Sequence, residues 1–72
     1  MPIVHIHLMQ GRPPERIEAM IAEVSQAIAG SIGAPIDSVR VLVHEMTDHQ
    51  YGVGGRPIRE ILAARAAQAK EA

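Results

Sequence analysis

Apolar and polar residues alternate at the start of the chain and then change to a helical spacing. The alternation over residues 2–8 predicts a strand, with Val4, Ile6 and Leu8 on one face and Ile3, His5 and His7 on the other. From residue 14 to 32, apolar residues recur at steps of three and four, which predicts one helix face: Ile17, Met20, Ile21, Val24, Ile28 and Ile32. Residues 38–46 are nearly continuous in β-favouring side chains and predict an interior strand.

Prolines and a glycine mark where the helix begins and ends. Pro13 and Pro14 suit its first turn, because proline is tolerated where the backbone N–H has no partner. Gly33 suits the C-cap, and Pro35 just beyond it prevents continuation. A strand, a helix of about 19 residues and a second strand form a βαβ unit, which predicts parallel strands and a right-handed crossover.

The remaining third of the chain predicts a smaller attachment to this unit. Residues 51–55 are rich in glycine and predict a turn or short hairpin. Residues 57–70 predict a C-terminal helix or tail, with one face that carries Ile58, Ile61, Leu62 and Arg65. There is no internal repeat, so we expect residues 1–72 to form a single domain of the α/β (α+β) class.

Length and composition predict an oligomer. The 72 residues are 47% hydrophobic, with one aromatic side chain and no cysteine. A chain this short buries only about 60% of its unfolded surface, and the usual remedies are disulfides, metals or oligomerisation. Without cysteine, neither disulfides nor thiolate metal sites are open to it. One helix covers one sheet face, so we expect another copy of the chain to cover the second.

The charge pattern excludes some classes of partner. The net charge is −1, which gives no global field for nucleic acid or an anionic membrane, and we expect neither. Six of the seven cations are arginine, whose planar fork suits carboxylates, although a codon bias explains the composition equally well. No apolar run reaches the roughly 18 residues of a membrane span. No signal-peptide pattern is present, and we expect a cytoplasmic protein.

Pro2 is the main candidate for chemistry. It follows the initiator methionine, which is normally removed before a small residue, and it begins the first predicted strand. Removal of methionine leaves a secondary amine. An ordinary α-amino group has a pKa of about 7.7–8.0, and an apolar pocket or nearby cations lower such a value. Pro2 is therefore a candidate general base at neutral pH, and the plainer alternative is a processing signal or the first residue of a strand.

Four histidines raise the question of a metal. His5 and His7 share one strand face, and His44 and His49 come later in the chain. Zinc needs three or four converging ligands, and two histidines on one strand do not supply them. We therefore expect no metal site. His44 shares a strand face with Arg40, which leaves a supporting role near that residue open.

A series of short motifs runs in order from residue 2 to about 55. They are Pro2-Ile3, Ile6-His7, Gly11-Arg12, Glu23-Val24-Ser25, Ala34-Pro35, Ser38-Val39-Arg40-Val41, Glu45-Met46 and Gly52-Val53-Gly54-Gly55. In this order and spacing the chain resembles the 4-oxalocrotonate tautomerase (2-hydroxymuconate tautomerase) family of the tautomerase superfamily. The resemblance implies the βαβ tautomerase fold, dimers that form four-stranded sheets, and a homo-hexamer built as a trimer of dimers. It also implies sites made from more than one chain.

The resemblance implies an isomerase. Members ketonise a 2-hydroxy-dienoate such as 2-hydroxymuconate to the conjugated 2-oxo acid, without a cofactor, in the catabolism of aromatic compounds. Pro2 matches the family proline that acts as general acid and base. Arg12 matches the arginine that binds the distal carboxylate of a dicarboxylate substrate. Arg40 matches the arginine that binds the 2-oxo and 1-carboxylate end, usually from a neighbouring subunit.

Three further positions are substrate-binding candidates on the same grounds. Tyr51 stands where the family often has phenylalanine, and its ring is expected to form the apolar wall beside the proline, while its hydroxyl either points outward or hydrogen-bonds substrate. Met9 matches a position that contributes a backbone carbonyl or water contact. Ser38 matches a position that sometimes contacts substrate, and a structural serine at the start of the strand is the alternative. Arg56 follows the glycines and is either a third cation near the site or a solvated side chain.

Two alternatives stay open. The same fold and proline serve other substrates in this superfamily, including hydrolytic dehalogenation, which uses a cationic proline. The chain also fits a non-catalytic subunit of a hetero-oligomer. Every catalytic reading requires removal of Met1, because an amide nitrogen at Pro2 has no basic lone pair.

Overall fold

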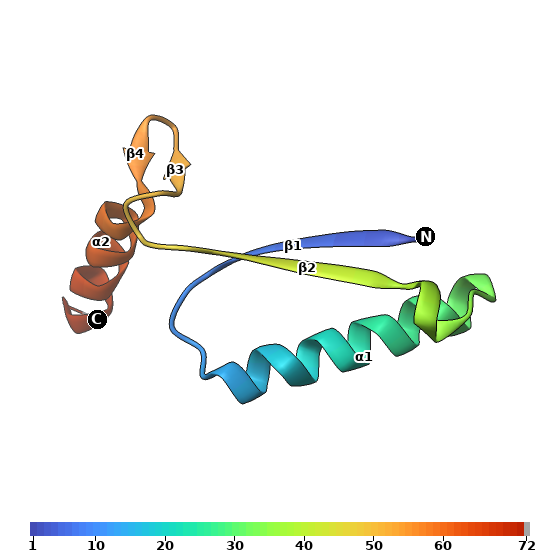
Figure 1. The fold of residues 1–72 in the computed structure, drawn as a ribbon. Coiled ribbons are helices and arrows are strands. Elements are labelled where there is room, and N and C mark those ends of the chain that lie inside the picture. Colours follow the sequence, from blue (N-terminus) through green and yellow to red (C-terminus); the bar gives the residue numbers. More distant parts are fainter. Residues whose placement is uncertain (72) are drawn as a thin grey trace.

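The computed structural model describes residues 1–71, and side chains up to Ala69. The elements in order are β1 (Ile3–Met9), α1 (Pro14–Ile32), the 3-10 turn η1 (Ile36–Ser38), β2 (Arg40–Met46), β3 (Gly52–Val53), β4 (Arg56–Pro57) and α2 (Ile58–Glu71). β1 and β2 lie side by side, α1 runs along one side of them, and the β3–β4 hairpin and α2 project from the far end (Figure 1). The predicted fold class, a parallel βαβ unit followed by a hairpin and a helix, is confirmed.

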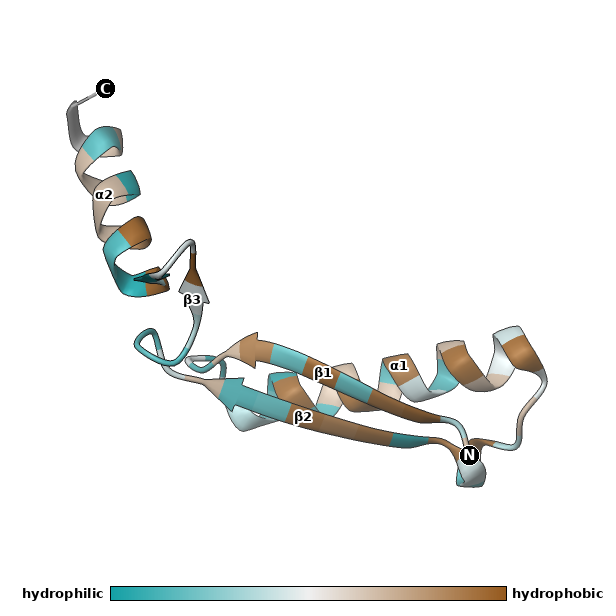
Figure 2. Cartoon of the chain, turned by 90° about the horizontal axis from the view of Figure 1, so that it is seen from above, coloured by the Kyte–Doolittle hydropathy of each residue, from teal (hydrophilic) through white to brown (hydrophobic). Residues whose placement is uncertain are grey.

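The two faces of the sheet differ in what covers them. β1 pairs with β2 in parallel, from Ile3 opposite Arg40 to Met9 opposite Met46. The residues that point toward α1 are half-buried, among them Val4, Ile6, Val41 and Val43. The opposite face is bare, and on it Ile3 stays 46% exposed and Leu42 42% exposed. Apolar stretches occur along β1, β2 and α1, interrupted by polar ones, while α2 extends away from the sheet (Figure 2).

The single chain does not enclose a core. None of the side chains that the structure describes is buried. The accessible surface is 5459 Å², whereas a compact protein of this mass exposes about 4,400 Å². The radius of gyration is 16.6 Å, against about 11 Å for a compact chain of this length. A bare apolar sheet face on so open a chain is typical of a subunit interface.

The helix α1 begins and ends at the predicted residues. Pro13 is its N-cap in an extended conformation, and Pro14 is its first residue. Gly33 takes the left-handed conformation at φ 70°, where its N–H donates to the Ala29 carbonyl and closes the last turn. Ile32, the last member of the predicted apolar stripe, is 64% exposed because this turn extends beyond the end of the sheet (Figure 1).

The two strands of the sheet start later than predicted. The strand predicted over residues 38–46 begins at Arg40, because the Ser38 N–H (2.9 Å) and Oγ (2.7 Å) both donate to the Pro35 carbonyl and close the turn η1. The strand predicted over 2–8 covers Ile3–Met9. Pro2 has no N–H to donate, but its carbonyl accepts the Arg40 N–H at 3.0 Å and thereby joins the ladder.

The hairpin and α2 are tied to each other by backbone hydrogen bonds. Gly54 (φ 61°) and Gly55 (φ 83°) form the two-residue turn, where both positions need a positive φ. The β3–β4 hairpin therefore extends past the predicted residues 51–55. The Ile58 N–H donates to the Tyr51 carbonyl at 2.8 Å, which fixes the start of α2 against the loop. No helix among residues 1–71 is long and apolar enough to cross a lipid bilayer.

Candidate active site

Pro2, Ser38 and Arg40 come together at the N-terminal end of the parallel strands. The Pro2 carbonyl accepts the Arg40 N–H at 3.0 Å. The Met1 ammonium donates to the Ser38 carbonyl at 2.9 Å. This backbone hydrogen bond places Pro2 and Arg40 side by side, although the two are 38 residues apart in sequence.

The Arg40 guanidinium is exposed and has no carboxylate partner. Its Nη1 donates to the carbonyls of Asp37 (2.6 Å) and Val39 (3.5 Å). Among the described residues it makes no ion pair. A guanidinium has five N–H donors, so Arg40 keeps donors and a full charge for a bound carboxylate or oxyanion.

The chemistry of Pro2 depends on the residue before it. Met1 precedes Pro2 in this structure, so the Pro2 nitrogen is a tertiary amide with neither a proton nor a basic lone pair. Removal of Met1 converts this nitrogen to a secondary amine at the head of β1. The same step releases the Ser38 carbonyl, which the Met1 ammonium otherwise occupies.

Met9, Arg12 and Tyr51 gather at the other end of the strands. Arg12 Nη1 donates to the Met9 carbonyl at 3.2 Å. Met9 and Tyr51 both line a hollow of about 300 Å³, together with His7, Leu8, Met46 and Ile58. The Tyr51 hydroxyl makes no hydrogen bond to the described residues. This hollow is a mostly apolar wall with one cation beside it.

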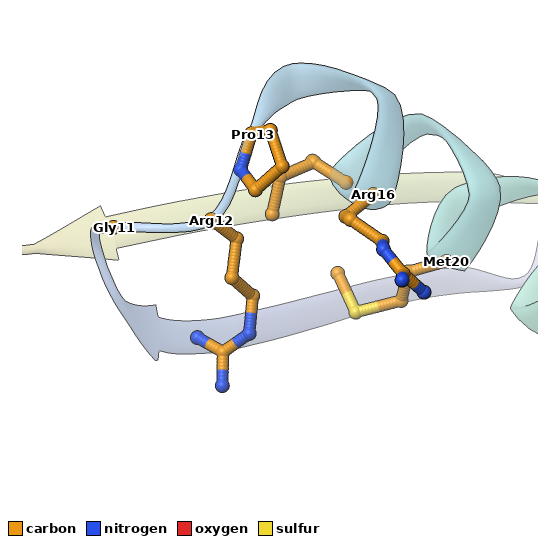
Figure 3. A pocket seen from close by; sticks show the side chains of 6 residues that line it. Gly11, Arg12, Pro13, Arg16 and Met20 are labelled. Carbon is orange, nitrogen blue, oxygen red and sulfur yellow. The ribbon is translucent and has the colours of Figure 1, made fainter.

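A second hollow of about 460 Å³ lies next to Arg12. Its lining consists of Gly11, Arg12, Pro13, Arg16, Ile17 and Met20 (Figure 3). Arg16 was not among the site residues expected from the sequence. The signal for it was its position, four residues after Arg12 and within the first turn of the helix.

The expected site residues therefore form two groups in one chain. Met9 follows Pro2 by seven residues of extended chain, and a strand rises about 3.3 Å per residue, so about 23 Å separates the groups. No small ligand spans that distance. Neither hollow includes Pro2 or Arg40.

The histidines on the bare sheet face stack on one another. His44 lies between His5 and His7, with ring centroids 5.4 Å and 4.7 Å away, and His5 Nδ1 is 3.1 Å from His44 Nε2. Among the side chains that the structure describes, up to Ala69, no group of three or more histidine, aspartate or glutamate residues is arranged to hold a metal ion. His44 is four residues from Arg40 along β2, about 13 Å away. It therefore does not support Arg40 within the same chain.

Arg56 has a carboxylate partner. Its Nε lies 3.4 Å from Glu60 Oε2 in an exposed pair one helical turn apart. Such surface pairs contribute little to stability. The pairing nevertheless makes Arg56 less available as a third cation than Arg12 or Arg40.

Comparisons with known proteins identify the family. The sequence matches the family described as tautomerase enzyme over residues 2–61. It is 46% identical over 61 residues to a 2-hydroxymuconate tautomerase of Stutzerimonas stutzeri, which covers 85% of this chain and 97% of that one.

Two solved structures have the same fold. TomN, a 4-oxalocrotonate tautomerase homologue in the tomaymycin biosynthetic pathway, superposes with a TM-score of 0.81 at 32% identity and covers 86% of this chain and 95% of that one. A heterohexamer 4-oxalocrotonate tautomerase from Chloroflexus aurantiacus J-10-fl superposes with a TM-score of 0.78 at 26% identity and covers 85% and 98%.

The fold and the matched residues define a small βαβ protein of the tautomerase class. The match to the family extends over most of the chain, and a named relative is well above 30% identical. This chain belongs to the tautomerase family, and it is an isomerase of the 4-oxalocrotonate tautomerase type.

Proposed function

We propose that this protein ketonises 2-hydroxymuconate, or a closely related 2-hydroxy-dienoate, to the conjugated 2-oxo acid without a cofactor. The observation that carries the proposal is that Pro2 and Arg40, whose guanidinium has no ion pair among the described residues, lie at the same end of the strand pair in a chain that belongs to the tautomerase family. The names of the relatives support the substrate class. Residues 1–72 form one tautomerase domain in this proposal.

Pro2, once Met1 is removed, is the acid and base. Its neutral amine takes the proton from the 2-hydroxyl, the double bonds shift, and the ammonium returns a proton to carbon. One O–H bond breaks and one C–H bond forms, so no other reactant is needed. Arg40, which the family resemblance expects from a neighbouring subunit, binds the 2-oxygen and the 1-carboxylate, where its charge stabilises the negative charge that develops as the proton leaves.

The complete site is built between chains. Two sheets that pair about a two-fold axis run antiparallel, so the start of β1 in one chain lies near the end of β1 in the other. That pairing brings Pro2 to the Arg12 and Tyr51 of a partner subunit, and it closes the distance of about 23 Å that separates the two groups within one chain. A homo-hexamer built from three such dimers also covers the bare sheet face.

The apolar hollow has a role in this arrangement. The side chains that line this hollow of about 300 Å³, including Leu8, Met9 and Met46, exclude water from the Pro2 amine of the partner subunit. Desolvation disfavours the ammonium and lowers the pKa of such an amine. Tyr51 closes one side of this wall, and Ser38 offers its carbonyl to the substrate.

The test is ultraviolet detection of ketonisation of 2-hydroxymuconate by protein whose intact mass shows that Met1 is absent. Pro2→Ala retains a small second residue, so processing continues. We expect it to lose about 100-fold or more in turnover, since that is the usual contribution of general acid–base catalysis. Its assembly mass should be unchanged. Full turnover by a processed Pro2→Ala protein would reject Pro2 as the acid and base.

A further inference from the structure

Arg12 and Arg16 are two cationic side chains that line the same hollow. Both side chains line the space of about 460 Å³ at the start of α1, with Ile17 and Met20 as its apolar part (Figure 3). Both residues are exposed. Among residues 1–69, whose side chains the structure describes, Arg12 donates only to the Met9 carbonyl and the Arg16 side chain makes no hydrogen bond.

Neither cation has a counterion in the described part of the chain. The ion pair found there joins other residues, on the hairpin and α2. Glu15 and Glu18 belong to the same turn of α1 but do not line the hollow. Two guanidiniums that line one space leave it with an excess of positive charge, and a bound carboxylate offsets this charge by accepting hydrogen bonds from guanidinium N–H groups.

The backbone here offers few donors of its own. A helix N-terminus usually binds anions through free N–H groups, but Pro13 and Pro14 have none. The N–H groups of Arg16 and Ile17 both donate to the Pro13 carbonyl, at 3.0 Å and 3.4 Å. Pro13 and Pro14 therefore reduce what the backbone can contribute here, and Arg12 and Arg16 are the lining residues whose side chains carry donors.

We propose that Arg16 is a specificity-determining residue that binds, together with Arg12, the distal carboxylate of a dicarboxylate substrate. The inference rests on the proposed tautomerase function and adds a second cation at the distal end. Arg16 lines the hollow next to Arg12 and does not line the apolar hollow that receives the partner's proline, so it binds substrate away from the reacting carbon atoms. Its contribution is therefore to binding, and it favours dicarboxylic over monocarboxylic dienols.

The kinetic test compares two substrates with the Arg16→Gln variant. For 2-hydroxymuconate, which has a distal carboxylate, KM should rise about tenfold, the usual effect of losing a charged hydrogen bond. Its kcat should change less than about twofold, because binding at a remote carboxylate is uniform between ground and transition states. For 2-hydroxy-2,4-pentadienoate, which lacks that carboxylate, both constants should be those of the wild type.

The control is Arg65→Gln, which removes the same charge from α2, away from both hollows. It should leave KM for both substrates unchanged, and both variants should keep the wild-type assembly mass. An equal rise in KM for the two substrates in Arg16→Gln would show a general structural effect and would overturn the proposal. So would an unchanged KM for 2-hydroxymuconate.

A binding measurement separates this inference from the proposed function. Calorimetry with adipate, a saturated dicarboxylate that cannot tautomerise, does not depend on turnover. We expect the wild type to bind adipate and Arg16→Gln to bind it about tenfold more weakly. If the wild type turns over neither dienol, the proposed function fails. The adipate titration still shows whether Arg16 binds a carboxylate. Equal adipate affinity in the two proteins, or no binding by the wild type, would overturn the role of Arg16.

Discussion

Leu42→Asp should abolish assembly. Leu42 lies in the middle of β2, opposite His5 in the register, on the sheet face that α1 does not cover. It is 42% exposed in the single chain. If a second copy covers this face, the substitution places a carboxylate inside a subunit interface.

The expected cost has two parts. Full burial of a leucine side chain contributes about 1.5–3 kcal/mol, so the exposed 42% corresponds to about 1 kcal/mol that a partner supplies to each protomer. Desolvation of an unpaired carboxylate adds several kcal/mol more. The sum recurs in every copy of a symmetric assembly. Since the chain has no core of its own, loss of the interface should also lower its stability.

Sedimentation velocity measures the outcome directly. At micromolar concentration Leu42→Asp should sediment as a species much smaller than the wild type. Leu42→Met is the matched control, because a swap that conserves volume usually costs less than about 1.5 kcal/mol, and it should remain assembled. A Leu42→Asp protein with wild-type mass at the same concentration would refute the reasoning and place the interface on another face.

Four further substitutions test the site and the helix. Arg40→Ala should reduce kcat by about 100-fold or more, the usual cost of losing a group that stabilises developing charge. Arg12→Ala should mainly raise KM. If steady-state kinetics show equal losses of kcat in the two variants, the assignment of Arg40 to the transition state and of Arg12 to substrate binding is wrong. Tyr51→Phe should keep turnover within about threefold, because the hydroxyl has no partner in the described chain and the ring supplies the apolar wall; a larger loss in the same assay would show that the hydroxyl contacts substrate. Gly33→Ala should lower the free energy of unfolding by about 1–2 kcal/mol, because φ is 70° there, and a neutral result in denaturant titration would contradict the cap.

The sequence predicted the parts of the fold that local pattern controls. Apolar spacing, with Pro14 as a helix-start signal and Gly33 as a C-cap signal, predicts a helix over residues 14–32, and the structure has the helix at Pro14–Ile32. Strand parallelism followed from the length of the crossover. The start of β2 was wrong because it depends on two hydrogen bonds from Ser38 to one carbonyl, which periodicity does not report.

The site was harder to predict than the fold. Pro2, Arg12 and Arg40 came from motifs, and motifs carry no distances. Their separation into two groups follows from the parallel register, which places Pro2 beside Arg40 and Arg12 beyond the far end of the strands. Arg16 was missed because the direction of its side chain depends on the loop at Gly11 that brings α1 back along the sheet.

The claim that the site is shared between chains is tested most directly by mixing two defective subunits. Pro2→Ala and Arg12→Ala proteins are unfolded together in equal amounts, reassembled, and assayed with 2-hydroxymuconate at a concentration below KM. If the Pro2 and Arg12 of one site come from different chains, each of the two residues is intact in about half of the sites, and the two choices are independent. Both residues are then intact in about one quarter of the sites, and activity should recover to about one quarter of the wild type. Activity no higher than the mean of the two parents reassembled separately would contradict the account, because it would mean that each site takes both residues from the same chain.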